Sequence, residues 1–110
     1  MQFSLEAIND IAQNDENAIK NFNRIFIEQT INEDLPQLKQ STEDQNWQEA
    51  FQIAHKMKPS ITLYKITNSL AAIKEIETIK NQGHVSKERV NQLVNIIDSE
   101  LQIIKEQLLL

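Results

Sequence analysis

The sequence predicts an all-α protein, specifically an antiparallel up-down four-helix bundle with a short N-terminal helix. The chain has 110 residues, which is enough for one domain and one core. It contains one glycine, two prolines and no cysteine, so folds that depend on many tight turns or on disulfides are excluded. Apolar residues recur every three or four positions almost from end to end, as in amphipathic helices. We therefore treat residues 1–110 as a single helical domain.

The first predicted helix is short and covers residues 4–12. Ser4 is a suitable N-cap because its hydroxyl can accept a hydrogen bond from a backbone N–H of the first turn. Leu5, Ile8 and Ile11 follow at helical spacing, and we expect all three on one side of this helix.

The second predicted helix is long and contains a proline. Asp15 is a suitable N-cap, and apolar residues continue at helical spacing as far as Leu38. Pro36 lacks the N–H that would bond to the carbonyl of Asn32, which predicts a bend. Because the apolar stripe continues on both sides, we expect one bent helix that ends at about Thr42.

A polar break over residues 44–46 separates this helix from a third, which begins near Trp47. The acidic pairs at residues 33–34 and 43–44 are interpreted as solvated helix ends. Pro59 lies inside the third helix and predicts a second bend. The apolar stripe of the third helix has the spacing of a bundle and consists of Trp47, Ala50, Ala54, Met57, Ile61 and Tyr64.

Two further helices complete the predicted bundle. Thr67 or Asn68 can cap the fourth helix, which ends before Gly83, a residue suited to the left-handed conformation after a helix. Residues 86–89 open the last helix, whose apolar stripe is the most regular in the chain. The connections are short, and short connections make neighbouring helices antiparallel.

Charge and composition restrict the partners of the chain. Eleven Lys and Arg against 16 Asp and Glu give a net charge of −5, whereas nucleic-acid binding needs a clustered basic excess. No apolar run approaches the ~20 residues of a membrane span. The N-terminus lacks the basic and apolar regions of a secretory signal. We therefore expect a cytoplasmic chain that binds neither nucleic acid nor membranes. Its length and its start at Met1 favour a free-standing domain. We also expect a monomer, with no metal or cofactor on this chain.

The candidate for chemistry is one of two histidines. His84 follows Gly83 in a predicted connection, where an exposed loop histidine is the simpler interpretation. His55 lies on the third helix, roughly 130° from the centre of its apolar stripe, and therefore faces outward. Lys58 lies one turn further along the same face. An imidazole nitrogen is a good nucleophile near neutral pH, and an ammonium group can offset phosphoryl charge. On this geometry alone, an ordinary solvated pair remains the commoner arrangement.

The residues around His55 resemble a known family. The stretch Ala54-His55-Lys56-Met57-Lys58-Pro59-Ser60 is similar to the active-site signature of histidine-containing phosphotransfer (HPt) domains. In that family an Ala-His pair is followed by any residue, an apolar residue, Lys, Gly, and then Ser or Ala. Five of the six specified positions match in place: Ala54, His55, Met57, Lys58 and Ser60. The predicted helices before and after the motif also fall where the family has them, so the resemblance covers residues 15–108.

The resemblance implies a histidine phosphocarrier of a two-component phosphorelay. His55 would accept a phosphoryl group from the aspartyl-phosphate of a receiver domain and pass it to another receiver, and Lys58 would stabilise that group. Response-regulator receiver domains are the implied partners, with a hybrid sensor kinase as a further candidate. The partner's Asp, Lys and Mg²⁺ would carry most of the catalysis. The chain would then be a phosphotransfer intermediate rather than a self-sufficient enzyme.

The resemblance also implies a docking surface around the histidine, formed by Phe51, Gln52, Lys56, Pro59 and Thr62. The sequence departs from the family pattern at Pro59, where a glycine is usual, and at Lys65, where a glycine is common. Glu77 stands where family members often place a glutamine near the histidine. Because a carboxylate repels a phosphoryl group, we do not count Glu77 as a phosphate ligand.

Two other classes of function remain open. A helical interaction module that binds receiver or kinase domains keeps the fold without the phosphotransfer chemistry. A metal-binding bundle is less favoured, because it needs inward Glu and His pairs whereas the predicted core stripes are apolar. The relay hypothesis makes the stricter demand on the structure: His55 must be exposed, with Lys58 on the same face.

Overall fold

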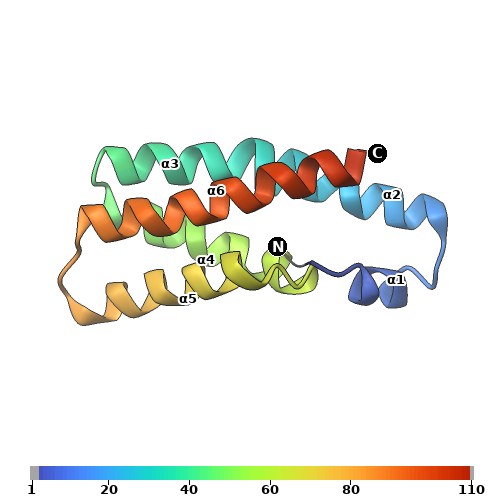
Figure 1. Cartoon of the computed structure of the whole chain (residues 1–110), viewed down its shortest axis with the longest axis horizontal. Helices are drawn as coiled ribbons and strands as arrows, with labels where there is room; N and C mark the ends of the chain where they lie inside the picture. The colour runs from blue at the N-terminus through green and yellow to red at the C-terminus, as the bar shows by residue number, and fades with distance from the viewer. Residues whose placement is uncertain (1–2, 110) are drawn as a thin grey trace.

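The computed structural model describes residues 3–109, and all regular secondary structure within that range is helical. The all-helical class predicted from the sequence is confirmed. The molecule is elongated, with extents of 45 × 22 × 20 Å (Figure 1). The elements in chain order are α1 (Glu6–Ile11), α2 (Glu16–Ile25), the π-helix η1 (Phe26–Asp34), α3 (Leu35–Glu43), α4 (Trp47–Leu63), α5 (Thr67–Gln82) and α6 (Lys87–Leu109).

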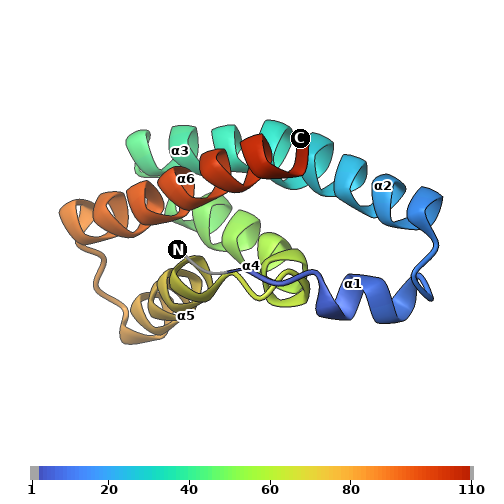
Figure 2. The ribbon, with the colours of Figure 1, turned by 45° about the vertical axis from the view of Figure 1, so that its right-hand side comes forward.

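Most of the core lies between the four helices of the C-terminal two thirds of the chain, and Ile8 of α1 and Phe26, Ile27 and Ile31 of η1 join it. Helix α3 packs against α4, α4 against α5, α5 against α6, and α6 against α3. The chain reverses direction at each connection between them (Figures 1 and 2). Each helix contributes a fully buried side chain, for example Leu38, Met57, Ile73 and Ile97 in chain order. Burial of these apolar groups is the main stabilising contribution to the fold.

The N-terminal segment packs against the far end of α4. The Ser4 hydroxyl accepts a hydrogen bond from the N–H of Glu6 at 3.1 Å, and the N–H of Ser4 donates to the carbonyl of Tyr64 at 2.8 Å. Helix α1 is shorter than expected. Ile8 is fully buried but Ile11 is 57% exposed, so the apolar residues expected on one side of this helix are not buried together. The helix ends at Ile11 and no other element covers that residue.

Helix α2 begins as predicted and continues without a break into η1 and α3. The Asp15 side chain accepts hydrogen bonds from the N–H groups of Asn17 and Ala18. The helical segment passes Pro36 and ends at Glu43, so the part of the prediction that the helix continues through the proline and ends near Thr42 is confirmed. Leu35 and Leu38, on either side of the proline, are both buried.

The π-helical turns of η1 were not indicated by the sequence. Just before the proline, the N–H of Leu35 bonds to the carbonyl of Thr30, five residues back rather than four. Wider turns change which side chains face the protein interior. Asp34 is only 4% exposed in this segment. The prediction that Asp34 belongs to a solvated helix end is therefore wrong.

Helix α5 is capped from another helix. The sequence suggested Thr67 or Asn68 as a local N-cap, but the helix begins at Thr67 and its N-cap residue makes no side-chain hydrogen bond. Instead, the Glu100 carboxylate of α6 accepts hydrogen bonds from the N–H and the hydroxyl of Ser69, both at 2.6 Å. The local prediction is wrong because the acceptor comes from a residue distant in sequence. At its other end, α5 stops as predicted at Gly83, which has a φ of 75°.

Within the described range, we find no helix that combines the length and apolar character needed to cross a membrane.

Candidate functional site

Helix α4 presents His55 on its outer surface. The Asn46 side chain caps the helix by accepting a hydrogen bond from the N–H of Glu49 at 3.3 Å. Ala54 and Met57 are both fully buried, and their burial fixes the rotation of the helix about its axis. The His55 side chain, between them in sequence, is 77% exposed. The outward orientation inferred from periodicity agrees with the structure.

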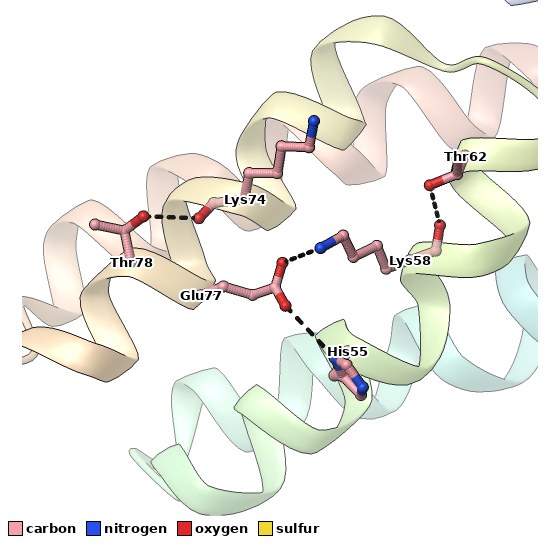
Figure 3. A network of polar contacts seen from close by, with 6 residues as sticks. All are labelled: His55, Lys58, Thr62, Lys74, Glu77 and Thr78. Carbon is pink, nitrogen blue, oxygen red and sulfur yellow. Dashed lines mark hydrogen bonds and ion pairs between the residues drawn. The ribbon is translucent and has the colours of Figure 1, made fainter.

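A carboxylate from the neighbouring helix joins His55 to Lys58. Glu77 projects from α5 toward α4, as Figure 3 shows. One of its oxygens, Oε1, accepts a hydrogen bond from Lys58 Nζ at 2.8 Å, and the other, Oε2, lies 3.4 Å from His55 Nδ1. The Lys58 and Glu77 side chains are 34% and 30% exposed. The imidazole and the ammonium group therefore share one face and one acidic partner.

The charge on Glu77 is stabilised by this arrangement. The hydrogen bond from Lys58 lowers the pKa of Glu77 from its ordinary value of 4.5, partial burial opposes that shift, and the contact with His55 adds to it. Glu77 is therefore a carboxylate near neutral pH, and an ionised carboxylate can only accept hydrogen bonds.

Because the Glu77 carboxylate can only accept a hydrogen bond, it favours one tautomer of His55. A contact between Oε2 of Glu77 and Nδ1 of His55 is favourable when Nδ1 carries the proton. In the neutral ring, Nε2 then has the free lone pair. At 3.4 Å the contact is long, and such contacts often shorten only when the reacting group is bound. The arrangement leaves Nε2 as the nucleophilic atom.

A shallow groove runs along α4 beside the histidine. It has a volume of about 340 Å³ and is lined by His55, Lys58, Pro59, Thr62 and Leu63. The Thr62 hydroxyl donates to the carbonyl of Lys58 at 2.8 Å, so it faces its own helix (Figure 3). Four of the sequence-predicted residues thus meet in one groove, with Leu63 as an apolar residue that the sequence did not single out.

The remaining predicted docking residues lie outside this groove. Phe51 is half-buried and Gln52 is exposed, both about one turn before His55. The Lys56 ammonium pairs with the buried Asp34 carboxylate of η1 at 3.1 Å, and the Lys56 side chain is 65% exposed. The structure therefore directs Lys56 toward η1.

The sequence did not indicate Asp34 as a partner of this site, and it placed Glu77 near His55 only through the resemblance, without predicting its contacts with Lys58 and His55. Residues 50–74 contain four lysines and no acidic residue. Any carboxylate that pairs with these lysines therefore comes from another part of the chain. Glu77 and Asp34 supply such carboxylates from α5 and η1. The contacts of both residues depend on how the helices pair, because neither residue is a neighbour of His55 in sequence.

No group of three or more His, Cys, Asp or Glu side chains that could hold a metal ion occurs among residues 3–109. Comparisons of the chain with protein-family models, with curated proteins and with solved structures found no match.

Proposed function

We propose that the chain is a histidine phosphocarrier of a two-component phosphorelay, with His55 as the phosphoacceptor. The observation that carries the proposal is the contact of Glu77 with Nδ1 on a ring that is 77% exposed. The contact leaves a nucleophilic Nε2 on an open surface. In-line attack on a phosphoryl group needs such access, and it needs little other machinery when the partner supplies the metal.

The remaining residues fit this role. The Nε2 lone pair attacks the phosphorus of an aspartyl-phosphate on a receiver domain, the P–O bond breaks, and the receiver carboxylate leaves with the electron pair. Lys58 offsets the charge of the phosphoryl oxygens. Pro59, Thr62 and Leu63 form the adjoining groove against which the receiver docks. Mg²⁺ belongs to the receiver in this scheme, and a hybrid sensor kinase is a further candidate partner.

We propose that α3, α4, α5 and α6 form an antiparallel up-down four-helix bundle of the HPt type, which holds His55 and Glu77 on adjacent helices. The contacts between α3 and α4, α4 and α5, α5 and α6, and α6 and α3 support it. In this role the chain acts as a cytoplasmic monomer, and as an intermediate rather than a self-sufficient enzyme.

One observation favours a second candidate, a helical interaction module that binds receiver or kinase domains without accepting a phosphoryl group. The Lys58 ammonium is already engaged by Glu77 at 2.8 Å. A module of this kind uses the same groove and the same partners, but nothing is transferred to His55.

Incubation with phosphorylated receiver domains separates the two candidates. The relay predicts a label on the chain that is labile in acid and stable in alkali, and that is absent from a His55→Gln variant. A matched His84→Gln variant changes the other histidine, which lies in an exposed connection, and should be labelled like the wild type. Absence of label with every receiver tested, together with retained binding, supports the interaction module instead.

A further inference from the structure

Glu77 lies beside the imidazole rather than beside the position that a phosphoryl group on Nε2 would occupy. Its Oε2 is 3.4 Å from Nδ1, and its Oε1 is held by Lys58. Nδ1 and Nε2 are on opposite sides of the ring, so a phosphoryl group on Nε2 does not displace the carboxylate. The expected repulsion between a carboxylate and a phosphoryl group is therefore reduced by position.

The proton on Nδ1 has a consequence for the loaded ring. After attack by Nε2, the ring carries a phosphoryl group on Nε2 and a proton on Nδ1, and it has one positive charge. Loss of that proton gives a neutral phosphoimidazole. A carboxylate that contacts Nδ1 favours the protonated form, because opposite charges at close range favour the charged state.

The proton on Nδ1 also determines the leaving group when the phosphoryl group is transferred from His55. When an acceptor carboxylate or a water molecule attacks the phosphorus, the Nε2–P bond breaks and its electron pair goes to Nε2. With a proton on Nδ1 the product is neutral imidazole. Without it the product is an imidazolate anion, which must then take a proton from the solvent. Neutral imidazole is the far better leaving group, so protonated phosphoimidazole releases its phosphoryl group faster.

We propose that Glu77 is a positioning residue for phosphoryl release: its carboxylate keeps the proton on Nδ1 of phosphorylated His55, so that transfer leaves neutral imidazole. The inference rests on the proposed function and adds to it the pH range over which the phosphoryl group can leave.

Loading should strengthen the contact. A phosphoryl group brings a charge of about −1.5 to −2 near neutral pH and competes with Glu77 for the Lys58 ammonium. Once Lys58 turns to the phosphoryl group, the positively charged imidazole ring is the remaining partner of Glu77. Lys58 bonds to Glu77 (Figure 3) and also lines the groove, so it can exchange one partner for the other.

The lysines on the two helices that carry His55 and Glu77 oppose protonation of the ring. Lys58 and Lys56 lie on α4, and Lys74 lies one turn before Glu77 on α5 (Figure 3). Asp34 of η1 is engaged by Lys56 at 3.1 Å. Within residues 3–109, Glu77 is the one carboxylate that contacts the ring. Removal of the Glu77 carboxylate should therefore make protonation of Nδ1 less favourable.

The test uses phosphoramidate as a small phosphoryl donor, so no protein partner is needed. All chains carry His84→Gln, which leaves His55 as the one histidine. Nε2 attacks the phosphorus of phosphoramidate, the P–N bond breaks and ammonia leaves. Loss of the phosphoryl group to water is then followed by phosphorus NMR across a range of pH. We expect Glu77→Gln to move the midpoint of the pH–rate profile about one unit lower. At mildly alkaline pH the loss should become about tenfold slower.

Two matched variants control for indirect effects. Glu75 lies on the same helix but pairs with Arg89 at 2.7 Å, so Glu75→Gln should leave the midpoint unchanged. Lys58→Gln removes a cation, and it should move the midpoint to higher pH. Circular dichroism checks that all variants keep the helical content of the parent.

Three results would overturn the inference. They are a midpoint that is unchanged or raised in Glu77→Gln, an equal shift in Glu75→Gln, or a chain that phosphoramidate does not load on His55. Failure of the proposed function is a separate result, because it is the absence of labelling by phosphorylated receivers. A chain that shows the shift with phosphoramidate but is never labelled by a receiver would contradict the relay alone.

Discussion

Replacement of Glu100 by alanine should destabilise the protein markedly, although the residue is far from His55 in sequence. Glu100 is 6% exposed on α6, and its Oε1 accepts two hydrogen bonds of 2.6 Å from Ser69 at the start of α5. Truncation leaves the buried N–H and hydroxyl of Ser69 without an acceptor. Helix α5 also carries Glu77, so this contact links the stability of the fold to the geometry of the site.

The magnitude follows from these two bonds. A hydrogen bond to a charged group contributes about 1.5–3 kcal/mol. The second carboxylate oxygen of Glu100, Oε2, is buried without a partner, and relief of that cost offsets part of the loss. We expect a net decrease of about 3 kcal/mol in the free energy of unfolding, out of a total of roughly 5–15 kcal/mol for a domain of this size.

Urea denaturation followed by circular dichroism measures this change. Glu100→Gln keeps an acceptor oxygen for Ser69, so it should cost only about 1 kcal/mol. Glu106 is an exposed residue of the same helix, and Glu106→Ala should stay within about 0.5 kcal/mol of the parent. If Glu100→Ala unfolds at the same urea concentration as Glu106→Ala, the reasoning about the α5 cap is refuted.

Three other substitutions test separate parts of the account. Leu101 is fully buried, so Leu101→Ala should cost ~2–4 kcal/mol in urea denaturation, whereas an unchanged midpoint would contradict the assigned core of α6. Lys58→Ala should slow phosphotransfer to His55 while the circular dichroism spectrum stays unchanged, and loss of helicity would contradict its surface placement. Gly83 has a φ of 75° and no atom within 4 Å of an added Cβ. Gly83→Ala should therefore cost about 1 kcal/mol through backbone strain alone, and a stabilised variant would argue against the left-handed helix end.

Local patterns in the sequence predicted the helices and the face on which His55 lies. The near absence of glycine and the spacing of apolar residues depend only on neighbours within two turns, and so does the alternation between buried Ala54, exposed His55 and buried Met57. Asp15 and Gly83 were also correctly assigned to helix ends, because capping is a local property.

The contacts that were missed all join residues distant in sequence. Asp34 faces inward because η1 adopts π-helical turns, and its partner Lys56 lies on the next helix. Glu100 caps α5 from α6. Glu77 was expected near His55 only through the resemblance, and its contacts with His55 Nδ1 and Lys58 were not predicted. Each of these contacts depends on how two helices are rotated and shifted against one another. A single sequence does not determine this relative placement to within the length of a side chain.

The most direct test of the central claim is transfer of a radiolabelled phosphoryl group from a phosphorylated receiver domain to this chain, and then to a second, unlabelled receiver. The account predicts an acid-labile label on His55 that passes on to the second receiver, is lost in His55→Gln and is retained in His84→Gln. Label that persists in His55→Gln, or a chain that binds receivers but takes no label from any of them, would contradict it.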